Sequence, residues 1–187
     1  MSLDQMVAVS GWMIVPLVLL GGLLHFVFDW TGHHRVAAVF GAVNESYWEH
    51  VKIAVWPVLL LQMVLFAAGG HRHAAFVPAA TVALYSIPVG MVGLVFLYKA
   101  VTGRNVLWLD LLVFAAVIVL AQVIFVQLVQ HLEATGTMVA LAVAYLLGLV
   151  VAFLRFTIHP PREPDVFIDP ITGGYGLGGH PDLGDRT

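Results

Sequence analysis

The chain lacks cysteine and carries very little charge. None of its 187 residues is cysteine, which excludes disulfide bonds, thiolate metal sites and cysteine nucleophiles. Only 10% of the residues are charged, whereas 60% are hydrophobic and the mean hydropathy is +0.94. A typical soluble domain is about 25% charged. A soluble fold of this size could not bury so much apolar surface, so we expect the protein to lie in a lipid bilayer.

The sequence also lacks the features of several other protein classes. The formal net charge of −3 excludes a generally basic protein that coats nucleic acid. Residues 1–10 contain neither lysine nor arginine, so the basic region of a cleavable signal peptide is missing. No phosphate-binding loop, nucleophile elbow, zinc-protease motif or dinucleotide fingerprint is found.

Five apolar segments are long enough to cross a bilayer as helices, which takes about 20 residues. They cover approximately residues 11–30, 46–69, 74–98, 106–130 and 138–156. A shorter apolar stretch between the first two, residues 36–43, is typical of an interfacial helix or turn. The sequence therefore predicts an all-α fold, a polytopic transmembrane bundle of about five helices, in a domain of residues 1–158.

Residues 159–187 differ sharply from the rest of the chain because they are rich in proline and glycine. This composition predicts a soluble, irregular C-terminal tail that is mobile unless it packs on the membrane domain or on a partner. Residues 167–170 are its only apolar cluster and are the expected contact.

Basic residues are distributed unequally between the two ends of the predicted bundle. One end receives Arg35, Lys99, Arg104, Arg155 and Arg162, with Lys52 just inside the membrane, and the other end receives Arg72 alone. Loops rich in lysine and arginine stay in the cytoplasm. We therefore expect a multi-pass protein of the cell membrane with its N-terminus outside and its C-terminus in the cytoplasm.

Ionisable residues within membrane spans are costly and are therefore candidates for function. His25 and Asp29 are four residues apart and share a helix face, as do Glu45 and Glu49. We expect these four residues to converge at the cytoplasmic end of the bundle. Imidazole and carboxylate groups together are suitable ligands for a divalent metal, zinc or iron.

Other polar residues near this end are secondary candidates for the site. They are Asn44, Ser46, His50, Lys52 and Asp110. His50 is expected to face away from the stripe that contains Glu49 and Lys52, because one residue turns a helix by about 100°. A proton relay or a polar path for a solute is an alternative to a metal site.

Purely structural roles are a further alternative for the same residues. Ser46 followed by Glu49 fits a capping box at the start of the second span. Glu49 and Lys52 could form an ion pair at the membrane interface, and His25 could form a hydrogen bond with Asp29.

Two segments resemble the motifs of a known family. Residues 24–32 (LHFVFDWTG) and 42–52 (AVNESYWEHVK) are similar to the motifs HF-x-(Y/F)-(D/E)-W and VNES-x-WEH-x-K. These motifs mark a family of small multipass membrane proteins of bacteria and archaea, a domain of unknown function. The five-span pattern and the tail are also similar. The resemblance implies no activity, but it implies that the polar residues above belong to the family's signature, which favours the hypothesis that they act together.

Three functions are compatible with the sequence. The first is a metal-dependent membrane enzyme acting on a lipid or a small amphiphile. The second is a small proton-coupled transporter or channel subunit, expected to be a homo-oligomer because five helices leave little room for a solute path. The third is a non-catalytic membrane module that docks a protein partner through residues 167–176 of its tail.

Overall fold

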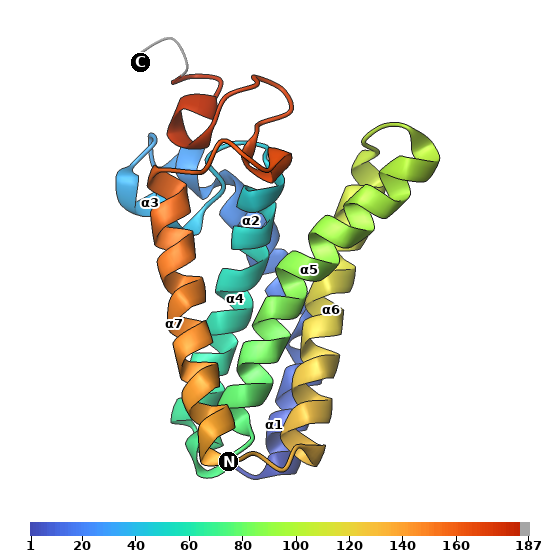
Figure 1. Ribbon diagram of the computed structural model, residues 1–187, viewed down its shortest axis with the longest axis vertical. Coiled ribbons are helices and arrows are strands. Elements are labelled where there is room, and N and C mark those ends of the chain that lie inside the picture. Colours follow the sequence, from blue (N-terminus) through green and yellow to red (C-terminus); the bar gives the residue numbers. More distant parts are fainter. Residues whose placement is uncertain (184–187) are drawn as a thin grey trace.

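A computed structural model describes residues 1–183, and these residues form a bundle of helices (Figure 1). The prediction of an all-α transmembrane bundle is confirmed. The α-helices are α1 (Leu3–Trp12), α2 (Ile14–Trp30), α3 (Arg35–Phe40), α4 (Tyr47–Ala67), α5 (Phe76–Thr102), α6 (Leu107–His131) and α7 (Gly136–Ile158). Three 3₁₀ turns, η1 (Gly70–Arg72), η2 (Asp165–Phe167) and η3 (Gly176–Gly179), lie in the connections and the tail.

Four helices, α4 to α7, are long and apolar enough to cross a membrane on their own. The pair α1 and α2 makes a fifth crossing if it is one span, although the two helices meet at an angle of 49°. The break falls at Met13, three residues before Pro16. Proline has no backbone N–H to donate to the carbonyl of Trp12, so the helix is interrupted at this position.

The most buried helix is α4, which packs against α2 and α5 along its length (Figure 1). Its residues Val55, Val58 and Leu65 are fully enclosed, as are Leu84 of α5 and Val117 of α6. In contrast, α7 contacts mainly α5 and leaves most of its surface exposed. This side of the bundle is therefore loosely closed.

The tail folds over one end of the bundle, above α3, α4 and α7 (Figure 1). Phe167 is buried against Trp48 of α4 and Phe156 of α7. The carboxylate of Asp169 is completely buried in the protein. The expected contact segment, residues 167–170, thus packs on the chain's own helices.

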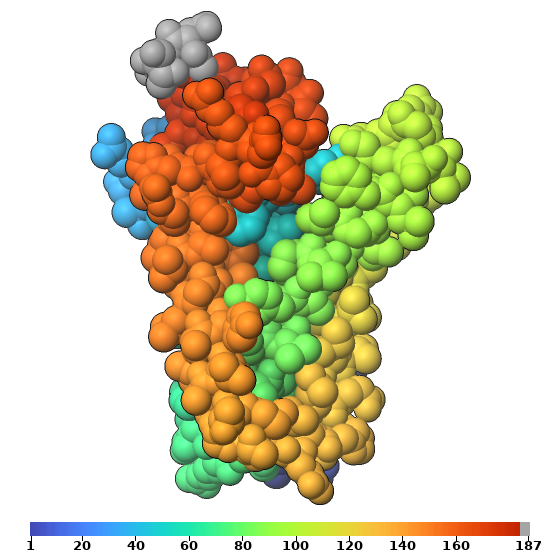
Figure 2. Space-filling view, viewed as in Figure 1, coloured from blue at the N-terminus to red at the C-terminus, as the bar shows by residue number. Residues whose placement is uncertain are grey.

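A hollow separates the tail from the hairpin of α5 and α6, which leans away from the bundle at the tail end (Figures 1 and 2). Residues of α4 form the floor of this hollow in the space-filling view (Figure 2). The candidate site lies here.

Candidate metal centre

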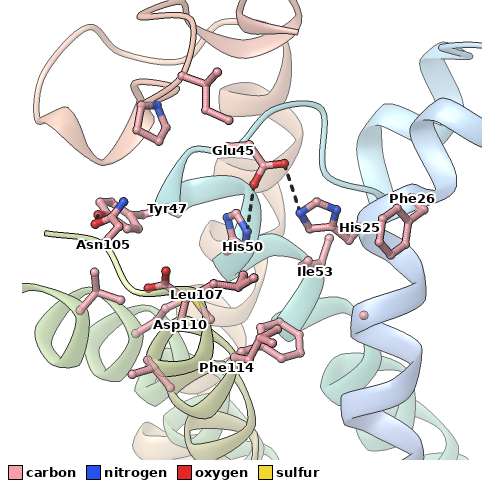
Figure 3. A pocket seen from close by; sticks show the side chains of 17 residues that line it. His25, Phe26, Glu45, Tyr47, His50, Ile53, Asn105, Leu107, Asp110 and Phe114 are labelled. Carbon is pink, nitrogen blue, oxygen red and sulfur yellow. Dashed lines mark hydrogen bonds and ion pairs between the residues drawn. The ribbon is translucent and has the colours of Figure 1, made fainter. Parts of the chain in front are cut away.

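Two imidazoles and one carboxylate meet at the rim of the hollow (Figure 3). The Nε2 atom of His25, on α2, lies 3.4 Å from Oε1 of Glu45. The Nε2 atom of His50, in the first turn of α4, lies 3.6 Å from Oε2 of the same carboxylate. Glu45 belongs to the loop between α3 and α4, so three separate elements contribute to the cluster.

The loop that carries Glu45 is held in place by buried polar contacts. The backbone N–H of Glu45 donates to Oδ2 of Asp169 at 2.8 Å. The side chain of Asn44 donates to the carbonyl of Gly176 at 2.8 Å and accepts from the backbone N–H of Ser46 at 2.9 Å. Ser46 is the N-cap of α4. The helix start and the tail together fix the position of the carboxylate.

The hydrogen bond of Nδ1 shows which ring nitrogen of His50 carries a proton. Nδ1 lies 2.9 Å from the backbone carbonyl of Ser46, which can only accept a hydrogen bond, so Nδ1 carries a proton. In the neutral ring, Nε2 is then a bare lone pair directed at the carboxylate of Glu45. The lone pair of a neutral ring and the carboxylate repel each other, so the contact is favourable only with a positive charge there, supplied either by a bound metal ion or by a second proton on His50. Ligand histidines are oriented by such a backbone hydrogen bond in metal sites.

The distances within the cluster also suit a metal ion. Donor atoms about 2.0–2.2 Å from a tetrahedral zinc ion lie roughly 3.3–3.6 Å from one another. The Nε2 atoms of His25 and His50 lie 3.4 and 3.6 Å from different oxygens of Glu45, and one ligand atom from each of the three residues lies within 4.8 Å of the others. Contact with the imidazole of His25, and the nearby ring of His50, lower the pKa of the Glu45 carboxyl group below its usual value. Glu45 is thus charged at neutral pH, as a ligand must be.

The cluster borders a pocket of about 550 Å³ whose walls are mostly apolar (Figure 3). The apolar walls come from the membrane helices and include Phe26, Ile53, Met91, Leu111 and Phe114. Pro170 and Ile171 of the tail also line it. A polar side is formed by Tyr47, Asn105 and Asp110. The pocket therefore combines apolar space with polar groups at one end.

The secondary candidate Asp110 belongs to this polar side. It accepts a hydrogen bond from the hydroxyl group of Tyr98. Tyr47 accepts from Lys99 Nζ at 2.8 Å and lies 3.1 Å from Oδ1 of Asn105, to which it donates. These contacts join α4, α5 and the start of α6 across the hollow.

Asp29 lies in a different cluster from His25. Its Oδ1 is 2.8 Å from Nε2 of His180 in the tail and 3.3 Å from Nε2 of His33. His33 has φ of 65°, which is uncommon for a residue other than glycine, and follows Gly32, whose φ is 64°. This left-handed turn directs His33 back towards the end of α2.

Glu49 is found in a third environment, inside the bundle. Its Oε2 is 2.5 Å from Nζ of Lys52 and accepts the backbone N–H of Val43 at 3.0 Å. The predicted ion pair of Glu49 and Lys52 therefore forms. His50 faces away from both residues, as expected, and this direction brings it to Glu45.

The structure corrects the grouping of the four residues that were expected to converge. His25 and Glu45 stay together, while Asp29 and Glu49 each have other partners. The physical reason is that Glu45 precedes the helix and lies in an extended loop, so the helical spacing that placed it beside Glu49 does not apply. His33, Asp169 and His180 were not anticipated, because no local pattern connects the tail with α2 or with the loop before α4.

Comparison with known proteins gives a family but no activity. The model of a family of unknown function (DUF6512) matches residues 1–177. No curated protein and no solved structure matches the chain. The resemblance seen in the sequence is confirmed, and the matched range contains His25, Glu45, His50 and Asp169, whereas His180 lies beyond it.

Proposed function

The chain belongs to DUF6512, a family of unknown function. From the geometry of the site, we propose that the protein is a metal-dependent membrane enzyme that hydrolyses a lipid or a small amphiphile. The ligands are His25, Glu45 and His50, and the metal is zinc.

The observation that carries this proposal is the orientation of His50: its Nδ1 is held by a backbone carbonyl, and its Nε2 faces the carboxylate of Glu45 beside a second imidazole. Two histidines and one carboxylate are three protein ligands, which leave a fourth position for water or a substrate oxygen. Structural zinc sites, in contrast, are closed by four protein ligands. Zinc bound in this way lowers the pKa of bound water to about 7 and polarises a carbonyl oxygen.

The adjoining pocket supports an amphiphilic substrate. Its volume of about 550 Å³ lies within the range of small-molecule sites. The apolar chain of the substrate would lie against Phe26, Met91 and Phe114, with its ester group beside Glu45. In the reaction, the water oxygen bonds to the carbonyl carbon, the bond to the leaving oxygen breaks, and the water proton passes to the leaving alcohol.

Metal analysis of the purified protein tests the ligand set. We expect one zinc ion per chain in the wild type and less than about a tenth of this in His50→Asn, because two remaining ligands hold zinc poorly. His131→Asn is the matched control, since it removes an imidazole at the C-terminal end of α6, outside the pocket, and it should retain zinc. Equal zinc in wild type and His50→Asn would disprove the site.

A second variant separates the pocket from the metal. Gly22 lines the pocket, and a Cβ at this position would contact nothing within 4 Å. Gly22→Leu should therefore fill the pocket and abolish release of fatty acid from phospholipid vesicles while zinc is retained. Gly148→Leu on α7, at a glycine with equal free space, is the control. Two results would contradict lipid hydrolysis in this pocket. One is unchanged hydrolysis by Gly22→Leu, and the other is no hydrolysis by the zinc-bound wild type.

A further inference from the structure

A second cavity lies between α4, α5 and α7, on the loosely closed side of the bundle and away from the metal centre. Its volume is about 340 Å³. The inner wall consists of buried residues, among them Leu59, Phe76 and Leu84, while Met63 and Phe66 at its rim are exposed. The cavity is thus accessible from the surface that faces lipid.

One polar side chain lines this otherwise apolar cavity. Gln62 of α4 is only 3% exposed, and within residues 1–183 neither its Nε2 nor its Oε1 has a hydrogen-bond partner. A buried amide without partners costs free energy. A water molecule bound to both atoms would keep a second O–H group without a partner among the apolar walls, whereas an alcohol has no second O–H group.

We propose that this cavity binds a neutral lipid that carries a hydroxyl group, held by Gln62. A hydroxyl group can donate to Oε1 and accept from Nε2 of the same carboxamide, so it satisfies both unpartnered atoms at once. The alkyl chain occupies the apolar space lined by Ala80, Val143 and Leu146. A charged head group is excluded, because these walls offer no counter-ion and burial of an unpaired charge is far more costly. The inference is independent of the proposed enzymatic function.

The chain contains a matched control for this site. Gln122 of α6 is 2% exposed and also lacks hydrogen-bond partners among the described residues, but it does not line the cavity. Gln62→Leu and Gln122→Leu therefore make the same chemical change at equally buried positions. Both variants should fold, since each replaces an unpartnered amide by an apolar group of similar size.

The experiment measures thermal unfolding in phosphatidylcholine nanodiscs with added 1-dodecanol or dodecane. Dodecanol should raise the unfolding temperature of the wild type and of Gln122→Leu to a saturating value, and dodecane should not. For Gln62→Leu, the dodecanol concentration at half-saturation should rise roughly fivefold or more, the effect of one or two lost hydrogen bonds. An equal response of Gln62→Leu, or no saturable response of the wild type, would overturn the proposal.

Discussion

Lys52 shows how a single charged residue is accommodated inside this bundle. Its ammonium group is completely buried and donates to Oε2 of Glu49 at 2.5 Å, to the carbonyl of Ala38 at 2.7 Å and to the hydroxyl of Thr157 at 3.3 Å. All three N–H groups are therefore satisfied. The contacts join α3, α4 and α7, so we assign Lys52 and Glu49 a structural role.

Replacement of Lys52 by Met should destabilise the protein strongly. It leaves Glu49 charged and unpaired in the core, which costs about 3–5 kcal/mol in the free energy of unfolding. The double variant Lys52→Met with Glu49→Leu should recover most of this loss, because an apolar pair needs no compensation. Unfolding in detergent, followed by the loss of helical circular dichroism, measures both. A single variant as stable as the wild type would show that the pair does not hold the helices together.

Local contacts of this kind could be predicted from the sequence, whereas contacts with the tail could not. Glu49 and Lys52 are three residues apart in a helix, and Ser46 is the N-cap that the pattern indicated. The contact of Asp29 with His180, in contrast, spans 151 positions. Neither the residue types nor their spacing predicts a contact between the end of α2 and the tail, since this contact depends on how the tail folds back over the bundle.

At the scale of elements, Asp169 and His180 of the tail form hydrogen bonds with the helical domain, in addition to the bond from Asn44 to Gly176. Asp169 accepts the backbone N–H groups of Glu45, Ile171 and Thr172 at 2.8, 2.7 and 2.8 Å. Nδ1 of His180 accepts the backbone N–H of Asp182 at 3.2 Å, so the neutral ring carries its proton on Nε2 and donates to Asp29. A direct hydrogen bond therefore joins the tail to the end of α2.

Removal of the tail should weaken zinc binding at the proposed metal centre rather than unfold the helices. A chain that ends after Arg162 keeps α1 to α7 but loses the Asp169 carboxylate that fixes Glu45. Loss of a group that orients a metal ligand typically reduces affinity about 10–100-fold. Zinc titration of the truncated protein in detergent, compared with the wild type and with Asp169→Asn, measures the effect.

Two results would contradict this assignment of the tail. Unchanged zinc affinity after truncation would show that the loop holds Glu45 without help. Aggregation of the truncated protein in detergent would show that the tail is part of the fold. The effect on zinc affinity would then be measured by comparing Asp169→Asn with the wild type.

The helices themselves could be predicted from apolar runs, but the break in the first span could not. Pro57 and Pro88 lie inside continuous helices α4 and α5, whereas Pro16 follows a break. Neighbouring helices can satisfy the backbone groups that a proline leaves free. A proline within an apolar run therefore does not show whether the helix continues, since this depends on packing.

At the scale of the whole molecule, the fold separates the basic residues along the long axis of the bundle. The C-terminal ends of α5 and α7, the start of α3 and the tail lie at one end, and η1 lies at the other (Figure 1). The first end carries Arg35, Lys99, Arg104, Arg155 and Arg162, and the second carries Arg72. The proposed metal centre lies at the basic end.

This asymmetry leads us to propose that the tail and the metal centre face the cytoplasm and that the N-terminus is outside. Basic loops are retained on the cytoplasmic side, and five crossings place the two termini on opposite sides. A phosphatase reporter, active only outside, should be silent when fused at Thr187 and active when inserted at residues 134–136, between α6 and α7. A fluorescent reporter that folds in the cytoplasm should give the reverse pattern.

The count of crossings and the orientation can be distinguished in the same series. If α1 and α2 form one bent span, a reporter at Met1 should lie outside the cell, on the opposite side of the membrane from the loop before α4. If the two helices form a re-entrant loop, reporters at Met1 and in the loop before α4 should lie on the same side of the membrane. A change in the distribution of basic residues tests whether these residues set the orientation. Lys99→Gln and Arg104→Gln, combined with lysines added at residues 134–136, should produce a mixed population of orientations in the membrane. A phosphatase-active fusion at Thr187 of the wild-type chain would show that the basic end, and the metal centre with it, faces outward.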